Sequence, residues 1–244
     1  MTTWWSKSVC CAAVAAIVIL PVSALGYRFD LWSLQLGFLG LAIASGLAGL
    51  ALIGGFIALV VVVRKKADGE RNPILAGMVI SVIVVFLMGR QFLAASAVPP
   101  IHNISTDIRN PPGIVQLKAV RGNAANPWEY DAAAFAEQQH GAYPDIQSLP
   151  LNRSPATVLT EVVEVLEAMG LEVVATHPEM GLVEATDTTF WFGFKDDVSV
   201  RVSDQGGSGE RALVDVHSVS RVGQSDLGVN ARRIGEILKR LADG

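Results

Sequence analysis

Apolar and polar positions divide the chain into two parts of different character, with the change near residue 96. Three long apolar segments, residues 9–25, 31–63 and 73–89, hold no Asp, Glu, Lys or Arg. A stretch of about 20 such residues can cross a bilayer as a helix, because a helix satisfies its own backbone hydrogen bonds. The pattern therefore predicts an anchor of three transmembrane helices over residues 1–96.

The remaining sequence predicts a soluble domain of the α+β class. Residues 97–151 are punctuated by Pro, Gly and Asn, which indicates an extended wrapping or linker segment with one helix at 132–140. Residues 152–244 are the predicted core. There a helix follows Ser154-Pro155, four short alternating runs predict antiparallel strands, and an amphipathic stretch predicts a last helix over 229–241. Such an order favours a sheet with one face covered by helices.

Basic residues mark one of the two short loops of the anchor. Arg64, Lys65, Lys66 and Arg71 lie between the second and third apolar segments, whereas the other loop holds only Arg28. Loops rich in Lys and Arg stay in the cytoplasm. We therefore expect a multi-pass protein of the bacterial inner (plasma) membrane, with a cytoplasmic N-terminus and a periplasmic, extracytoplasmic C-terminal domain.

The first apolar segment has two interpretations. Val22-Ser23-Ala24 puts small residues where a signal peptidase would cleave. The apolar stretch is long for the core of a signal peptide, which favours a retained helix. Either outcome leaves the directions of the second and third segments unchanged.

Small residues four positions apart recur in the second apolar segment. Such spacing lets helices approach closely, either within the chain's own bundle or in a homo-oligomer. The pairs are Ala42 and Gly46, Ser45 and Gly49, and Ala51 and Gly55.

Charge is distributed unevenly between the two parts. Residues 1–96 hold seven Lys and Arg against three Asp and Glu, a net charge of +4. Residues 97–244 hold twelve against twenty, a net charge of −8, so the whole chain has −4. An acidic domain argues against nucleic acid as a partner and against a domain that lies flat on anionic lipid.

Signatures of catalysis and of metal binding are weak. The sequence holds no phosphate-binding Gly-rich loop with Lys, no HExxH, no CxxC and no G-x-S-x-G. We therefore predict no metal and no cofactor. Asp215 and His217 share a strand face and could act with Ser220 as a weak catalytic candidate, although a solvated strand face explains the same pattern.

Polar residues in three stretches form a candidate ligand-binding set. Ordinary structural roles compete with this interpretation: a solvated turn at Lys195-Asp196-Asp197, and capping of the last helix by Ser225 or Asp226. The run Phe190–Phe192 is likewise either a binding platform or part of the core. The candidate ligand-binding residues are His102, Thr106, Asp107, Lys195, Asp196, Arg221, Ser225 and Asp226.

Four stretches carry a resemblance to a known family. They are PPIHNISTD at 99–107, YPDI at 143–146, FGFKDDV at 192–198 and DVHSVSRVGQSDLGVN at 215–230. Together they resemble a bacterial and plastid family of domains of unknown function, DUF1499. The resemblance implies a membrane-anchored or secreted extracytoplasmic domain. It implies no settled activity and no catalytic residues.

These observations favour one functional hypothesis and leave two alternatives. We expect an integral membrane protein that presents an extracytoplasmic domain to an envelope protein or a small ligand, with the lipid bilayer as its other partner. The first alternative is an envelope hydrolase that acts on lipid or glycan. The second is an assembly factor that uses the glycine-rich second helix to hold a membrane complex.

The predicted orientation is tested by fusing reporters after Gly244. Because the basic loop fixes the directions of the helices, alkaline phosphatase should be active there and a cytoplasm-active fluorescent protein should stay dark. Fluorescence with an inactive phosphatase would contradict the orientation and redirect the search to cytoplasmic partners.

Overall fold

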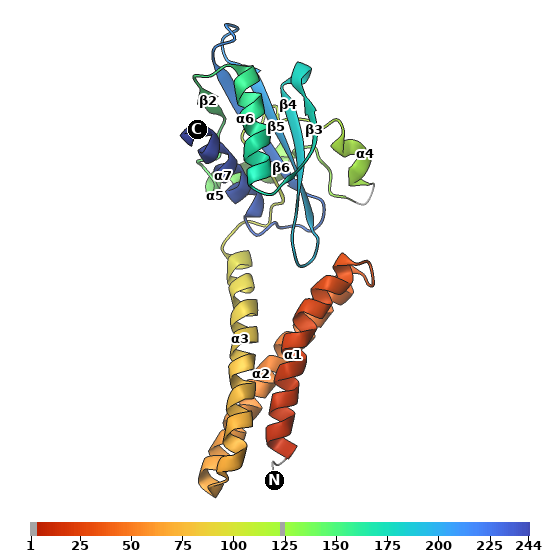
Figure 1. Ribbon diagram of the computed structural model, residues 1–244, viewed down its shortest axis with the longest axis vertical. Coiled ribbons are helices and arrows are strands. Elements are labelled where there is room, and N and C mark those ends of the chain that lie inside the picture. Colours follow the sequence, from red (N-terminus) through yellow and green to blue (C-terminus); the bar gives the residue numbers. More distant parts are fainter. Residues whose placement is uncertain (1–3, 123–124) are drawn as a thin grey trace. The chain divides into compact units, whose positions relative to one another are not determined.

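The computed structural model describes residues 4–122 and 125–244 (Figure 1). By their internal contacts these residues form two compact units. One is helical and reaches Ala94, and the loop Phe190–Gly193 groups with it. The other is a domain made of Ala95–Thr189 and Phe194–Gly244.

The helical unit contains three long apolar helices, as predicted. They are α1 (Trp4–Arg28), α2 (Leu34–Lys65) and α3 (Arg71–Ser96), with the short 3-10 helix η1 (Asp68–Glu70) before α3. Their most apolar windows have mean hydropathies of 2.5, 2.6 and 2.2, so each is long and apolar enough to cross a membrane.

Small residues let the helices of this unit approach one another. A methyl group added at Gly77 of α3 would lie 3.2 Å from the Cα atom of Cys10 in α1. Ala51 and Gly55 lie on the buried face of α2. Gly46 and Gly49 have open space where a side chain would begin. Packing within the bundle therefore accounts for the pair Ala51 and Gly55.

The domain is built on one antiparallel sheet of six strands. The strands are β1 (Asn103–Ser105), β2 (Leu149–Leu151), β3 (Glu172–His177), β4 (Leu182–Thr188), β5 (Lys195–Asp204) and β6 (Ala212–Ser220). Their order is β1-β6-β5-β4-β3, and β2 also pairs with β6. The last four strands are the predicted ones, so the α+β class and the helix–four strands–helix order are confirmed.

Two helices cover one face of the sheet (Figure 1). In α6 (Pro155–Ala168) the side chain of Ser154 accepts a hydrogen bond from the backbone N–H of Thr157, as its N-cap position requires. The second helix is α7 (Val229–Asp243). The stripes Val158, Val162 and Leu166 of α6 and Ile234, Ile237 and Leu241 of α7 are buried against Val198, Val200, Val214 and Val216 of the sheet.

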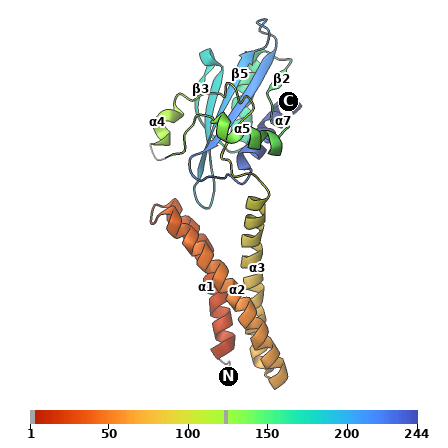
Figure 2. The ribbon, with the colours of Figure 1, turned by 180° about the vertical axis from the view of Figure 1, so that it is seen from behind.

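The segment before α6, residues 97–122 and 125–151, covers the other face of the sheet and is called the covering segment (Figure 2). It contains β1, α4 (Leu117–Arg121), α5 (Ala132–Ala142) and β2. The structure thus contains the predicted helix at 132–140 and adds two strands and a helix. Both strands are three residues long, too short for alternation to reveal them. Because β1 and β2 pair with β6, this segment is part of the domain and not a linker.

Candidate functional site

The sheet face under the covering segment is polar and buried. Side chains alternate along a strand, so every second residue of β4, β5 and β6 points away from α6 and α7. Buried polar groups are stable only when they are hydrogen-bonded. The buried polar residues on this face include Glu184, Thr186, Asp197, Ser199, Asp215 and His217.

Asp197 is the centre of a group of two ion pairs on this face. Its carboxylate is fully buried and accepts two hydrogen bonds of 2.8 Å from the guanidinium of Arg221. Arg121 of α4 donates to Oδ2, and the hydroxyl of Thr186 donates to Oδ1 at 2.7 Å. The guanidinium of Arg121 also lies over the ring of Trp128, 5.4 Å from its centroid. The carboxylate therefore joins α4, the end of β6 and two strands.

Glu184 attaches the same covering segment further along the sheet. Its two carboxylate oxygens accept hydrogen bonds from the backbone N–H groups of Val115, Gln116 and Leu117, at 2.8, 2.8 and 3.2 Å. The ring of His177 contacts it at 2.9 Å. Burial acts to raise the pKa of Glu184, but these hydrogen bonds outweigh burial and hold it below its ordinary value.

The carboxylate of Asp215 is also held by several hydrogen bonds. Arg201 donates to its Oδ2 at 2.7 Å, and the hydroxyl groups of Thr106 and Ser148 donate to its Oδ1. Arg201 also pairs with Asp107 at 3.2 Å. The predicted site residues Thr106 and Asp107 thus lie beside the predicted catalytic residue Asp215, and all three serve one hydrogen-bonded group.

His217 is fully buried and faces two acceptor oxygens. Its Nε2 lies 2.6 Å from Oδ1 of Asn103, and its Nδ1 lies 3.0 Å from the carbonyl oxygen of Pro112. A neutral ring carries one N–H and can donate to only one of them. Burial lowers the pKa of His217 to about 4, with the Pro112 contact acting in the opposite direction and Arg121 adding to the decrease.

The weak catalytic candidate does not form a proton relay. Asp215 and His217 share a strand face, as expected, but their polar atoms bond to other partners. Ser220 lies on the opposite face, where its hydroxyl oxygen accepts a hydrogen bond from Nδ2 of Asn230 at 3.0 Å. Within residues 4–122 and 125–244 no group of three His, Cys, Asp or Glu is arranged to hold a metal ion.

The expectation of a solvated turn at Lys195–Asp197 is wrong. These residues begin β5, so consecutive side chains point to opposite faces. Asp197 pairs with Arg121 and Arg221, and Asp196 pairs with Arg233 of α7 at 2.8 Å. The two carboxylates are therefore buried on different sides of the sheet and do not form an exposed pair.

The other predicted ligand-binding residues gather at one end of the sheet. The carbonyl oxygen of His102 accepts from the backbone N–H of Ser220, and that of Lys195 accepts from Arg221. The carboxylate of Asp226 accepts from the backbone N–H groups of Gly228 and Asn230, which supports its role at the start of α7. The hydroxyl of Ser225 accepts from the N–H of Leu227. Their binding of a ligand stays a prediction.

A family model for proteins of unknown function, DUF1499, matches residues 103–241. The chain belongs to this family. The match runs from the first residue of β1 into α7, so it includes the covering segment as well as the helix–strands–helix core. A search of the curated proteins finds no match.

The DUF1499 domain has a groove that the sequence did not reveal. The groove has a volume of about 870 Å³ and lies between α6 and the turn from β3 to β4. Leu159 and Val163 of α6 line one side. Met180 of the 3-10 helix η2 (Pro178–Met180) lines the other and is 54 % exposed. The lining is mostly apolar, which is typical of binding sites.

Backbone geometry fixes the turn that forms one wall of the groove. Gly181 has a φ of +60°, and a methyl group added there would lie 2.2 Å from the carbonyl oxygen of Val202. The backbone N–H of Val202 donates to the carbonyl oxygen of Gly181 at 2.7 Å. Only glycine fits this position, so the turn holds Met180 at the groove.

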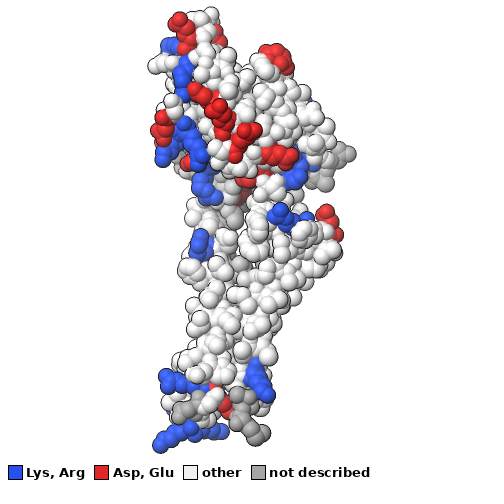
Figure 3. Space-filling view, in the orientation of Figure 1, with Lys and Arg blue, Asp and Glu red and all other residues white. Residues whose placement is uncertain are grey.

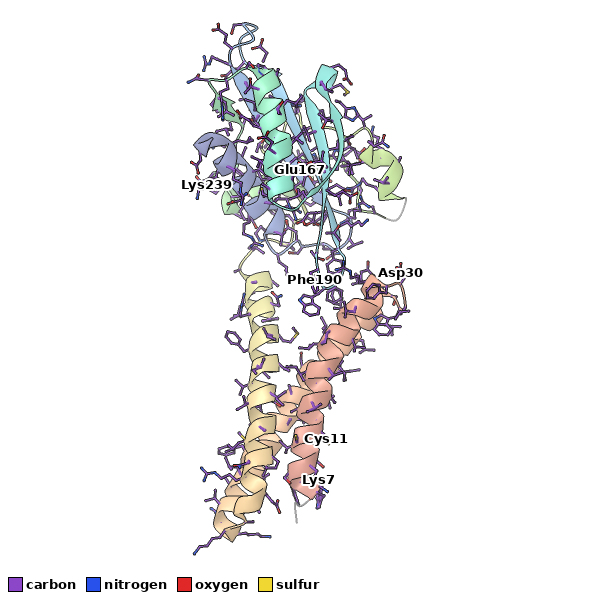
Figure 4. All side chains as sticks on the ribbon, in the orientation of Figure 1. Lys7, Cys11, Asp30, Glu167, Phe190 and Lys239 are labelled. Carbon is purple, nitrogen blue, oxygen red and sulfur yellow. The ribbon has the colours of Figure 1, made fainter. Side chains whose placement is uncertain are left out.

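Acidic residues border the groove. Glu164 of α6 and Glu179 of η2 are exposed and lie in its lining. Glu167, labelled in Figure 4, is also exposed on α6. Figure 3 shows acidic side chains gathered over α6. The groove therefore combines an apolar floor with a negative border.

Replacing Asp197 tests whether its ion pairs hold the covering segment. We expect Asp197→Ala to lower the free energy of unfolding by about 3–5 kcal/mol, because two buried guanidinium groups lose their carboxylate. Asp187→Ala is the matched control. The side chain of Asp187 is 35 % exposed and its partner Arg233 keeps Asp196, so its loss should be below about 1 kcal/mol.

The measurement is pulse proteolysis of the full chain in nanodiscs across a urea series. Equal losses in the two variants would contradict the central role of Asp197.

His217 makes the stability of the domain depend on pH. The unfolded residue binds a proton below about pH 6.5, whereas the folded residue binds it only near pH 4. Protonation therefore favours unfolding, and stability present above pH 6.5 should fall by about 3 kcal/mol as the pH decreases to 4.

The same urea series at several pH values measures this effect. His217→Gln should remove that part of the pH dependence, and the control His140→Gln, at an exposed residue, should leave it in place. An unchanged slope in His217→Gln would show that other groups cause it.

Proposed function

We propose that this DUF1499 protein is a membrane-anchored binding module whose extracytoplasmic domain holds a segment of an envelope protein in the groove beside α6. The observation that carries the proposal is the combination of an apolar floor with Glu164 and Glu179 at the border. The anchor of three apolar helices supports a function at a membrane.

The distribution of polar groups supports binding over a reaction on the sheet. Asp197, Asp215 and Glu184 are saturated by Arg residues, hydroxyl groups and backbone N–H groups. His217 is enclosed beneath the covering segment. In the groove, apolar and acidic side chains lie together at an open surface. A partner could bind there without breaking the hydrogen bonds of the buried carboxylates.

Charge identifies the class of segment that fits. α6 carries Glu161, Glu164 and Glu167 and no Lys or Arg. A segment with apolar side chains toward the floor and Lys or Arg toward the border would complement both features. The glutamates are spread along α6, so a partner that contacts all of them must be extended. This favours a protein segment over a small ligand.

A pair of peptides tests the proposal. A short fluorescent peptide of alternating Leu and Lys should bind the full chain in nanodiscs of zwitterionic lipid more tightly than its twin with Glu in place of Lys. The double variant Glu164→Lys/Glu179→Lys should weaken the Leu–Lys peptide about tenfold, since two attractions at the border become repulsions. Fluorescence anisotropy, corrected with empty nanodiscs, measures both affinities.

Glu137→Lys/Glu210→Lys is the matched control, because it makes the same change of charge at exposed residues away from the groove. An equal loss in the control would show a general charge effect and refute a site in the groove. Equal binding of the two peptides would refute the proposed partner class.

A further inference from the structure

An aromatic loop projects from the domain between β4 and β5. Its base is closed by two hydrogen bonds of 2.9 Å, from the backbone N–H of Thr189 to the carbonyl oxygen of Phe194 and from the N–H of Phe194 to the hydroxyl of Thr189. Phe190, labelled in Figure 4, is 71 % exposed and Trp191 is 54 % exposed. The core interpretation of this run is therefore wrong for these two residues.

The loop leaves the sheet at the same end as the chain that comes from α3. The register pairs Asn103 of β1 with Val219 of β6, and Val219 with Asp197 of β5. The first residues of β1 and β5 and the last residues of β6 therefore lie side by side. The residues that precede β1 lead back to α3, and the residues that precede β5 form the aromatic loop, so both leave the sheet at this line.

The connection to α3 is short. α3 ends at Ser96, and Ile101 is already fully buried in the domain, with its carbonyl oxygen bonded to the N–H of Asp226. Five extended residues span at most about 17 Å. The end of the sheet that carries the aromatic loop is therefore the end that a five-residue connection joins to an apolar helix.

We propose that Phe190 and Trp191 bind the boundary between headgroups and acyl chains of the bilayer that the apolar helices cross. Trp is suited to this region because its ring can be buried while the indole N–H stays hydrated, and Phe because its apolar ring can enter the edge of the acyl chains. The neighbouring side chain of Lys195 is exposed and can contact phosphate groups. The contact is confined to the loop, since the domain itself carries a net charge of −8.

Spin labels at the two ends of β4 test the proposal. Phe190→Cys labels the loop and keeps Trp191, and Met180→Cys labels the exposed turn at the opposite end of the strand. Both are made in the full chain with Cys10 and Cys11 replaced by Ala, because these are its only cysteines. Collision rates with oxygen and with a water-soluble nickel chelate are then measured in proteoliposomes.

The label at residue 190 should collide severalfold less with the nickel chelate than the label at residue 180 and should remain accessible to oxygen, because oxygen concentrates in the bilayer. Equal access of both labels to the chelate would overturn the proposal and place the loop in water. A label at 190 protected from both reagents would overturn it in favour of a protein contact. An unchanged urea midpoint in pulse proteolysis shows that each variant is folded.

The collision rates are measured without peptide, although the reference label at residue 180 stands in the wall of the groove. The peptide affinities measured above do not involve the loop, and the collision rates do not involve Glu164 or Glu179, so either proposal can fail alone.

Discussion

A carboxylate without access to water, held between two guanidinium groups, is the constraint on which the domain depends. Asp197 lies on β5, Arg121 on the segment before the core and Arg221 at the end of β6. The covering segment packs Ile114, Leu117 and Trp128 against Val219 of the sheet, and its attachment also depends on these charges and on the carboxylate of Glu184. Each charge is buried because its partner is present, which makes removal of either partner costly. Both faces of the sheet thus combine apolar packing with buried ion pairs: Asp196 pairs with Arg233 under α7, and Asp197 pairs with two arginines under the covering segment.

This arrangement limits where the domain can act. Residues that would serve catalysis in another setting, Asp215 and His217, are committed to holding the covering segment. The proposed partners are therefore assigned to the surface of the domain. The open surface carries the groove beside α6 and the aromatic loop. The groove lies at the first end of β4 and the loop follows its last residue. One combines apolar and acidic side chains, and the other is aromatic. Two such different surfaces suit two different partners.

Periodic patterns let the sequence predict the helices and the long strands. The stripe Val158, Val162 and Leu166 marked α6 because its apolar residues repeat every three or four positions. The same reasoning could not predict that the polar face of the sheet is buried. Ser199 and Arg201 alternate with buried valines, which indicates a solvated face, and only the covering segment makes that face an interior. The groove was also missed, because Leu159 and Met180 come from different elements and meet only after folding. The exposed Met in a Pro- and Gly-bounded turn was the one local signal.

Distance along β4 makes the two proposed contacts compatible. Seven residues of strand at about 3.3 Å each place the groove roughly 20 Å from the loop. If the loop lies at the headgroups, a ligand in the groove contacts the domain at the other end of β4, separate from the bilayer contact. The proposed contact would also suit an acidic domain, because aromatic rings and not the domain's surface charges would make it. The negative border of the groove favours a basic segment as its proposed partner, since complementary charges stabilise such a contact.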